Sequence, residues 1–307
     1  MPRPIPVEEM VRQFKGHHRN SHIFRIDNFS LFGKYQIQEI ESSIFDIGGH
    51  KWKLVLFPNG NANDNGKDHV SLYLGIQDSE SRPSNWQVRL GYQLFLLNQF
   101  RQDWRMEQGN VVFNASNQKR GFSRLMAAAD FLNPNRGYLV DGCSLFGVKI
   151  LGMNDTKAGT AECFTLVEKP PNNVFSWKMM KFSALNRSSE YTSDEFVIGD
   201  RKLKIRIFPQ GTTAPDKLAV YLRGVGLKNN TTPKAKCYTR FRLRVLDKIK
   251  GKHVAHSYTF WFPVEPGGHG SQGFMPLKDL ANPSNYVVND TLYVEVEVDV
   301  ISTTKYC

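Results

Sequence analysis

The sequence predicts an all-β protein made of two similar antiparallel β-sandwiches in tandem. The first observation is a segment that occurs twice without a gap, FDIGGHKWKLVLFPNG at residues 45–60 and FVIGDRKLKIRIFPQG at residues 196–211. The second is the alternation of apolar and polar residues within such segments, which is the period of a strand with one face in a core. The third is that clusters of Gly, Pro and Asn separate many short segments of this kind, as they do in sandwiches.

The duplication is wider than this segment, and its parts keep the same order in both copies. The matched parts are 22–30 with 175–183, 70–74 with 218–222, 92–98 with 241–247, 121–125 with 273–277, and 131–142 with 280–290. A repeat this long predicts tandem domains, because solenoid and propeller repeats are much shorter. We therefore expect a flexible polar arm at 1–19, a first domain at 20–153, a connector with a short strand at 154–172, and a second domain at 173–307.

Individual strands follow from the alternation of residues along the chain. Apolar residues that should face a core alternate with polar or exposed ones at 51–56, 202–207, 240–245 and 291–300. Helix is expected in the first copy only as a short turn within 123–132, because Asn133-Pro134 stops it.

Composition bounds the class of protein. The chain has 307 residues, of which 40% are hydrophobic, and a net charge of +11; residues 173–307 contribute 20 basic and 12 acidic residues. The chain has no run of eighteen apolar residues and no signal-type stretch at its start, so we expect neither a membrane span nor secretion. The four cysteines are scattered, which favours a reducing compartment, cytoplasm or nucleus, without disulfides, metal or cofactor.

Several motifs together resemble the MATH domain, the meprin and TRAF-C homology domain. They are F-x-I-x-N-F-S at 24–30, W-K-L-x-x-F-P-N-G at 52–60, S-L-Y-L at 71–74, G-F at 121–122, and N-P followed by G-Y-L-V-D at 133–141. The double copy resembles the tandem MATH proteins of plants. The resemblance covers all but the first twenty or so residues and the connector, and it implies an eight-stranded antiparallel sandwich for each copy.

The resemblance also implies a function and a site. MATH domains hold short extended peptides of partner proteins in a shallow groove across one sheet. The groove positions carried over to this chain are Tyr73, Tyr92 and Phe122 in the first copy, and Tyr221, Phe241, Phe274 and Tyr258 in the second. Val112 falls where the first copy should match Tyr258.

The two copies depart from the family pattern before the Gly-Phe pair. Where the family has Asp-Trp, the first copy has Lys119-Arg120 and the second has Ser271-Gln272. Both grooves therefore lose a Trp, a residue that often anchors interfaces. The two cations predict that the first groove prefers acidic or phosphorylated peptides.

These observations predict a non-enzymatic interaction protein. A role as a substrate-recognition or scaffold factor linked to ubiquitination is what the resemblance alone implies. The chain has neither H-E-x-x-H nor the Cys and His boxes of the proteases fused to some MATH domains. Its length leaves no room for a BTB, RING or protease domain, so we expect any link to a ligase to operate by recruitment.

Two alternative functions stay open. Basic stripes on predicted strands would suit nucleic acid or an anionic membrane; they are Lys202, Lys204 and Arg206, and Arg240, Arg242 and Arg244. The structural interpretation of such a stripe is the solvated face of a strand. A structural role through self-association is the other alternative, although no heptad segment of the kind that drives trimers precedes either copy.

Overall fold

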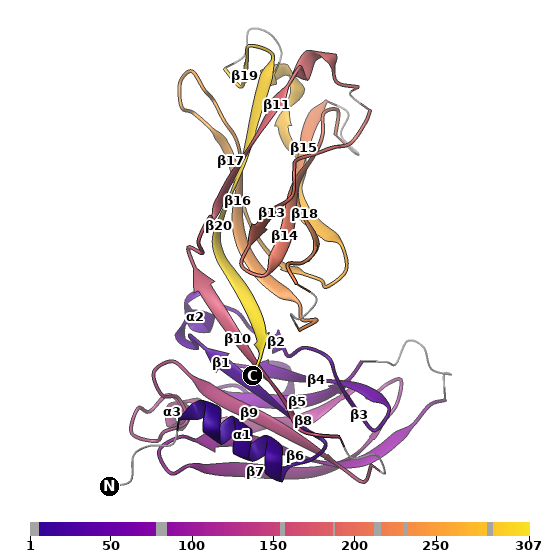
Figure 1. The fold of residues 1–307 in the computed structure, drawn as a ribbon, viewed down its shortest axis with the longest axis vertical. Helices are drawn as coiled ribbons and strands as arrows, with labels where there is room; N and C mark the ends of the chain where they lie inside the picture. Colours follow the sequence, from indigo (N-terminus) through magenta and orange to yellow (C-terminus); the bar gives the residue numbers. More distant parts are fainter. Residues whose placement is uncertain are drawn as a thin grey trace. The chain divides into compact units, whose positions relative to one another are not determined.

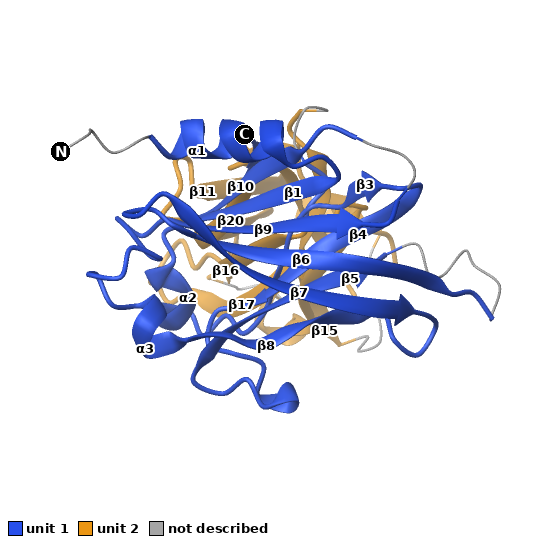
Figure 2. Cartoon of the chain, turned by 90° about the horizontal axis from the view of Figure 1, so that it is seen from below, with its two compact units in different colours: residues 1–166, 233–235, 304–307 blue, residues 167–232, 236–303 orange. Residues whose placement is uncertain are grey.

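A computed structural model describes residues 6–77, 85–153, 157–186, 188–211, 216–229, 233–280 and 285–307. The chain divides into two compact units, shown in separate colours in Figure 2. Unit 1 comprises residues 1–166, 233–235 and 304–307, and unit 2 comprises 167–232 and 236–303. Parts of two predicted segments, 154–156 in the connector and 281–284 in the last repeated segment, lie outside the described residues. Strands dominate both units, which confirms the all-β class.

Unit 1 is a sandwich of two sheets (Figure 1). The first has the order β10 (Thr160–Glu168), β1 (Ser21–Asp27), β9 (Ser144–Leu151), β6 (Val88–Asn98), β7 (Asp103–Phe113). The second has the order β2 (Ile40–Glu41), β4 (His50–Phe57), β5 (His69–Ile76), β8 (Lys119–Ala127), with β3 (Phe45–Ile47) beside β4. The pairs are antiparallel except β1 with β10, which run parallel. Short helical segments are α2 (Ser30–Lys34), η1 (Ala62–Asp64) and α3 (Ala128–Phe131).

A helix precedes the first strand, and the predicted flexible arm was wrong for these residues. Helix α1 (Val7–His17) places Met10, Val11 and Phe14 on one side, at the spacing of an amphipathic helix. These side chains are buried against the outer face of the first sheet, in a cluster completed by Ile23, Phe95, Leu97, Cys143, Leu145 and Ala161. Strand β1 is therefore covered on both faces, which explains its nearly continuous burial.

The helical turn predicted within 123–132 is shorter than expected. Residues up to Ala127 continue strand β8, and only Ala128–Phe131 form α3. Leu125 and Met126 are buried from this strand, so core packing overrode the helix propensity of the Leu-Met-Ala run.

Unit 2 repeats the sandwich. In one sheet β16 (Cys237–Val245) pairs with β17 (Val254–Phe262) and β20 (Thr291–Tyr306), which in turn pairs with β11 (Val174–Met180) and β19 (Val287–Val288). The other has the order β12 (Tyr191–Thr192), β14 (Arg201–Phe208), β15 (Lys217–Leu227), β18 (Gly267–Pro276), with β13 (Phe196–Ile198) beside β14. Two short helical turns, η3 (Phe182–Ala184) and η4 (Leu277–Leu280), complete the unit. Burial alternates along β14, β16 and much of β20, as the sequence predicted.

The segment that occurs twice forms the same structure twice: a short strand, a tight turn and a long strand. Gly48 and Gly199 occupy the turns with φ of 61° and 63°, a left-handed conformation that favours glycine. In each copy, the hydroxyl of a serine that precedes the short strand accepts a hydrogen bond from the backbone of the long strand. Ser42 Oγ accepts from the backbone N–H of Leu54 at 2.8 Å, and Ser193 Oγ accepts from that of Ile205 at 2.9 Å.

Candidate functional site: the strand edges of the two sandwiches

Each sandwich has one side where the last strand of one sheet lies beside the last strand of the other. These strands are β7 and β8 in unit 1, and β17 and β18 in unit 2. Among the described residues, no further strand pairs with the outer side of β7 or β17. An unpaired strand side carries backbone N–H and C=O groups that can bond an added strand.

In unit 1 an aromatic pair lies inside this edge. The ring of Tyr92 on β6 lies 6.1 Å from that of Phe122 on β8, between centroids. Gly109 on β7 is the cross-strand partner of Tyr92, and the ring occupies the space where a side chain of residue 109 would stand. Tyr92 is only 4% exposed. Burial raises the pKa of its phenol, against the opposing effect of the Arg120 charge, so the phenol stays neutral.

Arg120 lies on the same side of β8 as Phe122. Its cross-strand partner on β5 is the buried Leu74, and cross-strand partners project to the same face. The Arg120 side chain is exposed. Of the predicted residues of the first copy, the structure thus brings Tyr92, Arg120 and Phe122 together.

Tyr73 and Lys119 lie elsewhere, on the outer face of the second sheet. Tyr73 forms a small cluster with Val55 and Phe57, and Lys119 Nζ is 4.8 Å from the Phe57 ring centroid and 5.3 Å from that of Tyr73. The Tyr73 hydroxyl donates to Asp64 at 2.7 Å, and burial together with this bond raises its pKa to about 12. The two predicted cations therefore face opposite sides of the sheet, because they are adjacent residues of a strand.

In unit 2 the edge carries a longer aromatic row. Tyr258 on β17 lies across from Phe241, with centroids 5.4 Å apart. His269 on β18 packs 5.5 Å from Tyr258 and stacks at 4.6 Å on Phe260. Phe241 is fully buried, whereas Tyr258, Phe260 and His269 are partly exposed. Burial raises the pKa of Tyr258.

Two members of this row were not predicted from the sequence. Phe260 belongs to the alternation of aromatics at 258, 260 and 262, which could have predicted it from the strand period. His269 lies in the glycine-rich run 266–270, which has no pattern that would single it out.

The strand register corrects the matching of the two copies. Tyr73 pairs with Gly121 in unit 1, and Tyr221 pairs with Gly270 in unit 2. Ser271, which follows Gly270, therefore corresponds to Phe122. Phe274 lies three residues further on; it is 2% exposed and contributes to the core of unit 2. The sequence match placed Phe274 opposite Phe122 because the glycine-rich run before it has no pattern that would reveal the displacement of three residues.

The same comparison relates the other predicted positions. Because Tyr92 pairs with Gly109 and Phe241 pairs with Tyr258, Gly109 rather than Val112 corresponds to Tyr258. Tyr221 packs against Phe208 at 6.2 Å, much as Tyr73 packs against Phe57 at 5.6 Å.

The basic stripes of unit 2 lie beside carboxylates. Residues Arg240, Arg242 and Arg244 of β16 face the acidic residues of β20, at 3.9 Å for Arg240 to Asp299, 3.8 Å for Arg242 to Glu297 and 3.0 Å for Arg244 to Glu295. On β14, Lys202 lies 3.4 Å from Glu195 and Arg206 lies 2.6 Å from Glu190, with the partly buried Lys204 between them. This pairing offsets much of the positive charge that the sequence placed here.

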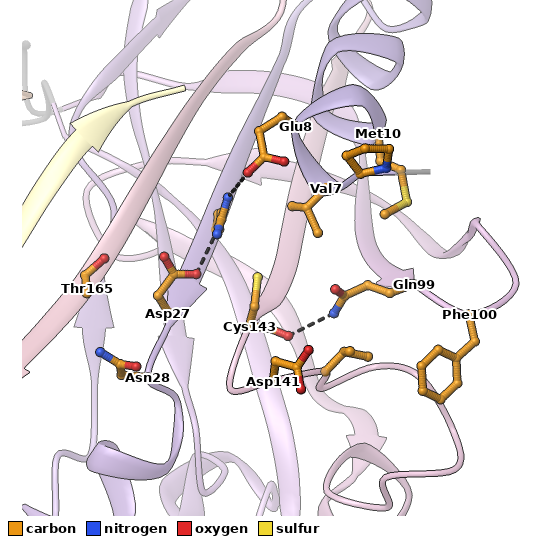
Figure 3. A pocket seen from close by; sticks show the side chains of 13 residues that line it. Val7, Glu8, Met10, Asp27, Asn28, Gln99, Phe100, Asp141, Cys143 and Thr165 are labelled. Atoms are coloured by element: carbon orange, nitrogen blue, oxygen red, sulfur yellow. Dashed lines mark hydrogen bonds and ion pairs between the residues drawn. The ribbon is translucent and has the colours of Figure 1, made fainter. Parts of the chain in front are cut away.

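A separate hollow of about 690 Å³ lies in unit 1 beside the start of α1 (Figure 3). Its polar side chains bond largely to one another. Arg25 donates to Glu8 at 3.0 Å and to Asp27 at 2.9 Å, and the Gln99 amide donates to the carbonyl of Cys143 at 2.8 Å. Burial would raise the pKa of Asp27, but hydrogen bonds from Cys163 and Arg25 outweigh it and hold that pKa below its usual value. These pairings leave few of the hollow's polar groups for a ligand.

Neither a metal-binding cluster nor a membrane-spanning helix is found in the described part of the chain. It holds no group of three or more His, Cys, Asp or Glu side chains placed to bind a metal ion. No helix there combines the length and apolar character needed to cross a bilayer.

Comparison with known proteins places the chain in a family. The profile of the MATH domain matches residues 21–150 and again 174–298. The chain belongs to the MATH domain family. It is a tandem MATH protein of the plant type, as the sequence motifs predicted, and MATH domains are protein-interaction modules.

Two curated relatives each match a stretch of this chain about as long as one domain. Ubiquitin C-terminal hydrolase 13 of Arabidopsis thaliana is 34% identical over 45% of this chain and 12% of its own length. A MATH domain and coiled-coil domain-containing protein of the same plant is 34% identical over 38% of this chain and 41% of its own length. The solved structure of Notothenia coriiceps TRAF5 aligns over 42% of this chain and 73% of that chain, with 23% identity and a TM-score of 0.36. The chain thus spans less than half the length of the curated relatives it matches.

Proposed function

We propose that this tandem MATH protein is a non-enzymatic module that binds short extended segments of partner proteins along its two strand edges. The observation that carries the proposal is the same at both edges. An unpaired strand side, β7 or β17, lies beside aromatic side chains that face the neighbouring sheet edge.

The chemistry of the edges suits an added strand. A peptide laid along β7 or β17 would satisfy the outer backbone groups, while alternate side chains would enter the gap toward β8 or β18. In unit 2 these side chains would meet Tyr258, Phe260 and His269, which are partly exposed. Aromatic side chains provide contact area at small entropic cost because they have few rotatable bonds.

Two edges in one chain give a further property. If one partner carries two suitable segments, binding of the first raises the effective concentration of the second, so avidity exceeds either single affinity. Two of the relatives are named ubiquitin C-terminal hydrolases. On this basis we extend the proposal to a scaffold or substrate-recognition role beside ubiquitin enzymes.

Binding of nucleic acid or anionic lipid by unit 2 is less well supported. The arginines of β16 each lie within 4 Å of a carboxylate on β20. A phosphate backbone would have to compete with these carboxylates, and its affinity would fall steeply with salt.

The test is selection from a random peptide library on the full chain, at low and high salt. We expect a motif that survives high salt and is lost in Tyr258→Ala or Phe122→Ala. Matched controls are Tyr306→Ala and Phe100→Ala, because these aromatics are 60% and 57% exposed and lie off the strand edges. Loss of the selected motif in Phe100→Ala alone would indicate that the peptide binds in the hollow of Figure 3 and not at a strand edge. Enrichment of acidic sequences that disappear at high salt would instead favour the charged surface.

A further inference from the structure

A second hollow of unit 1, of about 320 Å³, lies at one end of the β7–β8 edge. Three arginines from separate segments line it: Arg105 at the start of β7, Arg124 near the end of β8, and Arg136 in the loop after α3. His69, Tyr138 and Asp130 also line it, together with the 125–127 segment of β8. We call this hollow the arginine pocket.

Few carboxylates oppose the three guanidinium groups. Asp130 lies 3.4 Å from Arg136, and Glu107, outside the lining, lies 3.0 Å from Arg105. Arg124 donates through Nε to the backbone carbonyl of Asn65 at 2.8 Å. Each guanidinium has five N–H donors, so these contacts leave most donors of the pocket free. The pocket keeps an excess of positive charge even with both carboxylates counted.

The arginine pocket continues the edge that we propose as a peptide site. Arg105 is four residues from Gly109 on β7 and projects to the same face, because side chains alternate with a period of two. The distance along the strand is about 13 Å. Arg124 follows Phe122 on β8 where the register with β5 shifts, so it is the pocket lining, and not strand alternation, that places its side chain here. A peptide extended along β7 from the Tyr92–Phe122 pair would therefore reach the pocket about four residues later.

We propose that the arginine pocket binds a phosphorylated side chain of the peptide held at the β7–β8 edge. This inference rests on the proposed function of that edge and adds the chemical class of its ligand. A phosphate monoester carries nearly two negative charges and three acceptor oxygens, which matches several guanidinium groups at once. A single carboxylate can be paired by one guanidinium group, as Asp130 is by Arg136.

A peptide fits better than a nucleic acid at this place. Nucleic acids are bound along a track of cations that follows successive phosphates. Here the cations converge in one hollow, and Glu107 lies on β7 between Arg105 and the aromatic pair. That arrangement favours one anionic group attached to an otherwise neutral segment.

The test uses the full chain and a peptide library in which a fixed phosphoserine stands about four residues from a varied apolar position. The same library is made with serine and with glutamate. We expect phosphoserine peptides to bind about tenfold more tightly than their serine versions. The double variant Arg124→Gln/Arg136→Gln should reduce the affinity for phosphoserine peptides to the affinity for their serine versions. The control Arg12→Gln/Arg89→Gln, which removes the same charge from exposed positions outside the pocket, should leave the preference intact.

The outcomes separate this inference from the proposed function. Serine and phosphoserine peptides that bind equally would overturn the phosphate pocket and leave the peptide edge standing. Glutamate peptides that bind as tightly as phosphoserine ones would overturn the phosphate requirement. If no peptide binds, the edge function and the phosphopeptide both fall. A titration with inorganic phosphate, followed by the Nε–H NMR signals of the arginines, then reports on the bare pocket. Shifts of Arg124 and Arg136 beyond that of Arg89 would show an anion site, and equal shifts would contradict one.

Discussion

The ring of Tyr92 lies directly against Gly109, such that a Cβ atom added to the glycine would stand 2.7 Å from Cζ of the tyrosine. In unit 2 the corresponding pair is Phe241 and Tyr258, with two rings 5.4 Å apart. The two edges are therefore filled differently. Unit 1 places one ring over a glycine, and unit 2 places a second, partly exposed ring on the edge strand itself.

Gly109→Ala should displace the Tyr92 ring at little cost in stability. The added methyl group clashes with the far end of a movable side chain, while alanine is favoured over glycine in a strand. We expect a change of less than about 1 kcal/mol in the free energy of unfolding and a clear loss of affinity for peptides selected on unit 1. Urea titration and peptide binding measure the two effects. The control Gln108→Ala changes a side chain bonded to Gln93 outside the aromatic pair, and an equal loss of affinity there would contradict the assignment.

Acid should loosen the docking of helix α1 through His18. The imidazole lies 4.4 Å from the Phe14 ring and 5.4 Å from that of Phe95. Burial, followed by the charges of Lys149 and His17, lowers its pKa. The unfolded chain therefore binds the proton more readily than the folded chain. The contribution of neutral His18 to the free energy of unfolding is complete above the ordinary histidine pKa of about 6.5, and it is lost as the pH falls below that value.

The measurement is the free energy of unfolding at about pH 7.5 and about pH 5.5. His18→Phe should keep the packing and remove part of the acid loss. An acid loss of the same size in the variant would assign the effect to other groups.

Glu162 should be needed for the stability of unit 1. Its carboxylate is fully buried, accepts from the Ser43 N–H at 2.6 Å and from the Ser43 hydroxyl, and lies 3.9 Å from His22 Nε2. Glu162→Ala would leave buried donors without an acceptor, and we expect a loss of about 3 kcal/mol. Denaturant unfolding checks this value. The control Glu39→Ala removes an exposed carboxylate 3.9 Å from Lys119 and should change stability by less than about 0.5 kcal/mol.

Ser42 and Ser193 should contribute about equally to the stability of unit 1 and unit 2. Each hydroxyl also donates to the carbonyl of the next residue, at 2.8 Å for Ser42 and 2.7 Å for Ser193, so both bonds of the hydroxyl recur in the two units. Ser42→Ala and Ser193→Ala should each cost about 1–2 kcal/mol because the strand N–H loses its partner. Hydrogen exchange should show faster exchange at Leu54 in one variant and at Ile205 in the other. Loss of protection at both positions from a single substitution would show that the units do not respond separately.

Strand positions could be predicted well because their signal is local. Alternation at 202–207 and 240–245 reports directly which side chains face a core, and the structure confirms both. Helix α1 was missed because its apolar residues Met10, Val11 and Phe14 are few and lie among charges. Its stability comes from the sheet face that it covers, which a local pattern does not contain.

The candidate site could be predicted only in part. The motifs named Tyr92 and Phe122 separately, and only the structure shows that their rings lie 6.1 Å apart between the two sheets. Separating Lys119 from Arg120 likewise required knowing which face of the strand each residue occupies. Phe274 was misplaced because a short Gly-Phe motif does not fix the strand register: Gly273-Phe274 repeats the letters of Gly121-Phe122, but it lies three residues beyond the positions that pair in the same way. The arginine pocket could not be predicted for a simpler reason, since its three arginines come from separate segments that only the fold brings together.

The place of α1 also affects how a fragment of this protein would behave. Similarity to the family begins at residue 21, yet the sheet face formed by Ile23, Phe95, Leu97 and Leu145 is buried under a helix that ends at His17. A fragment started where the similarity starts would expose that apolar face to water. Such a fragment would be expected to associate with itself, because contiguous apolar surface of this kind drives association. The unit recognised by resemblance is smaller than the unit that folds.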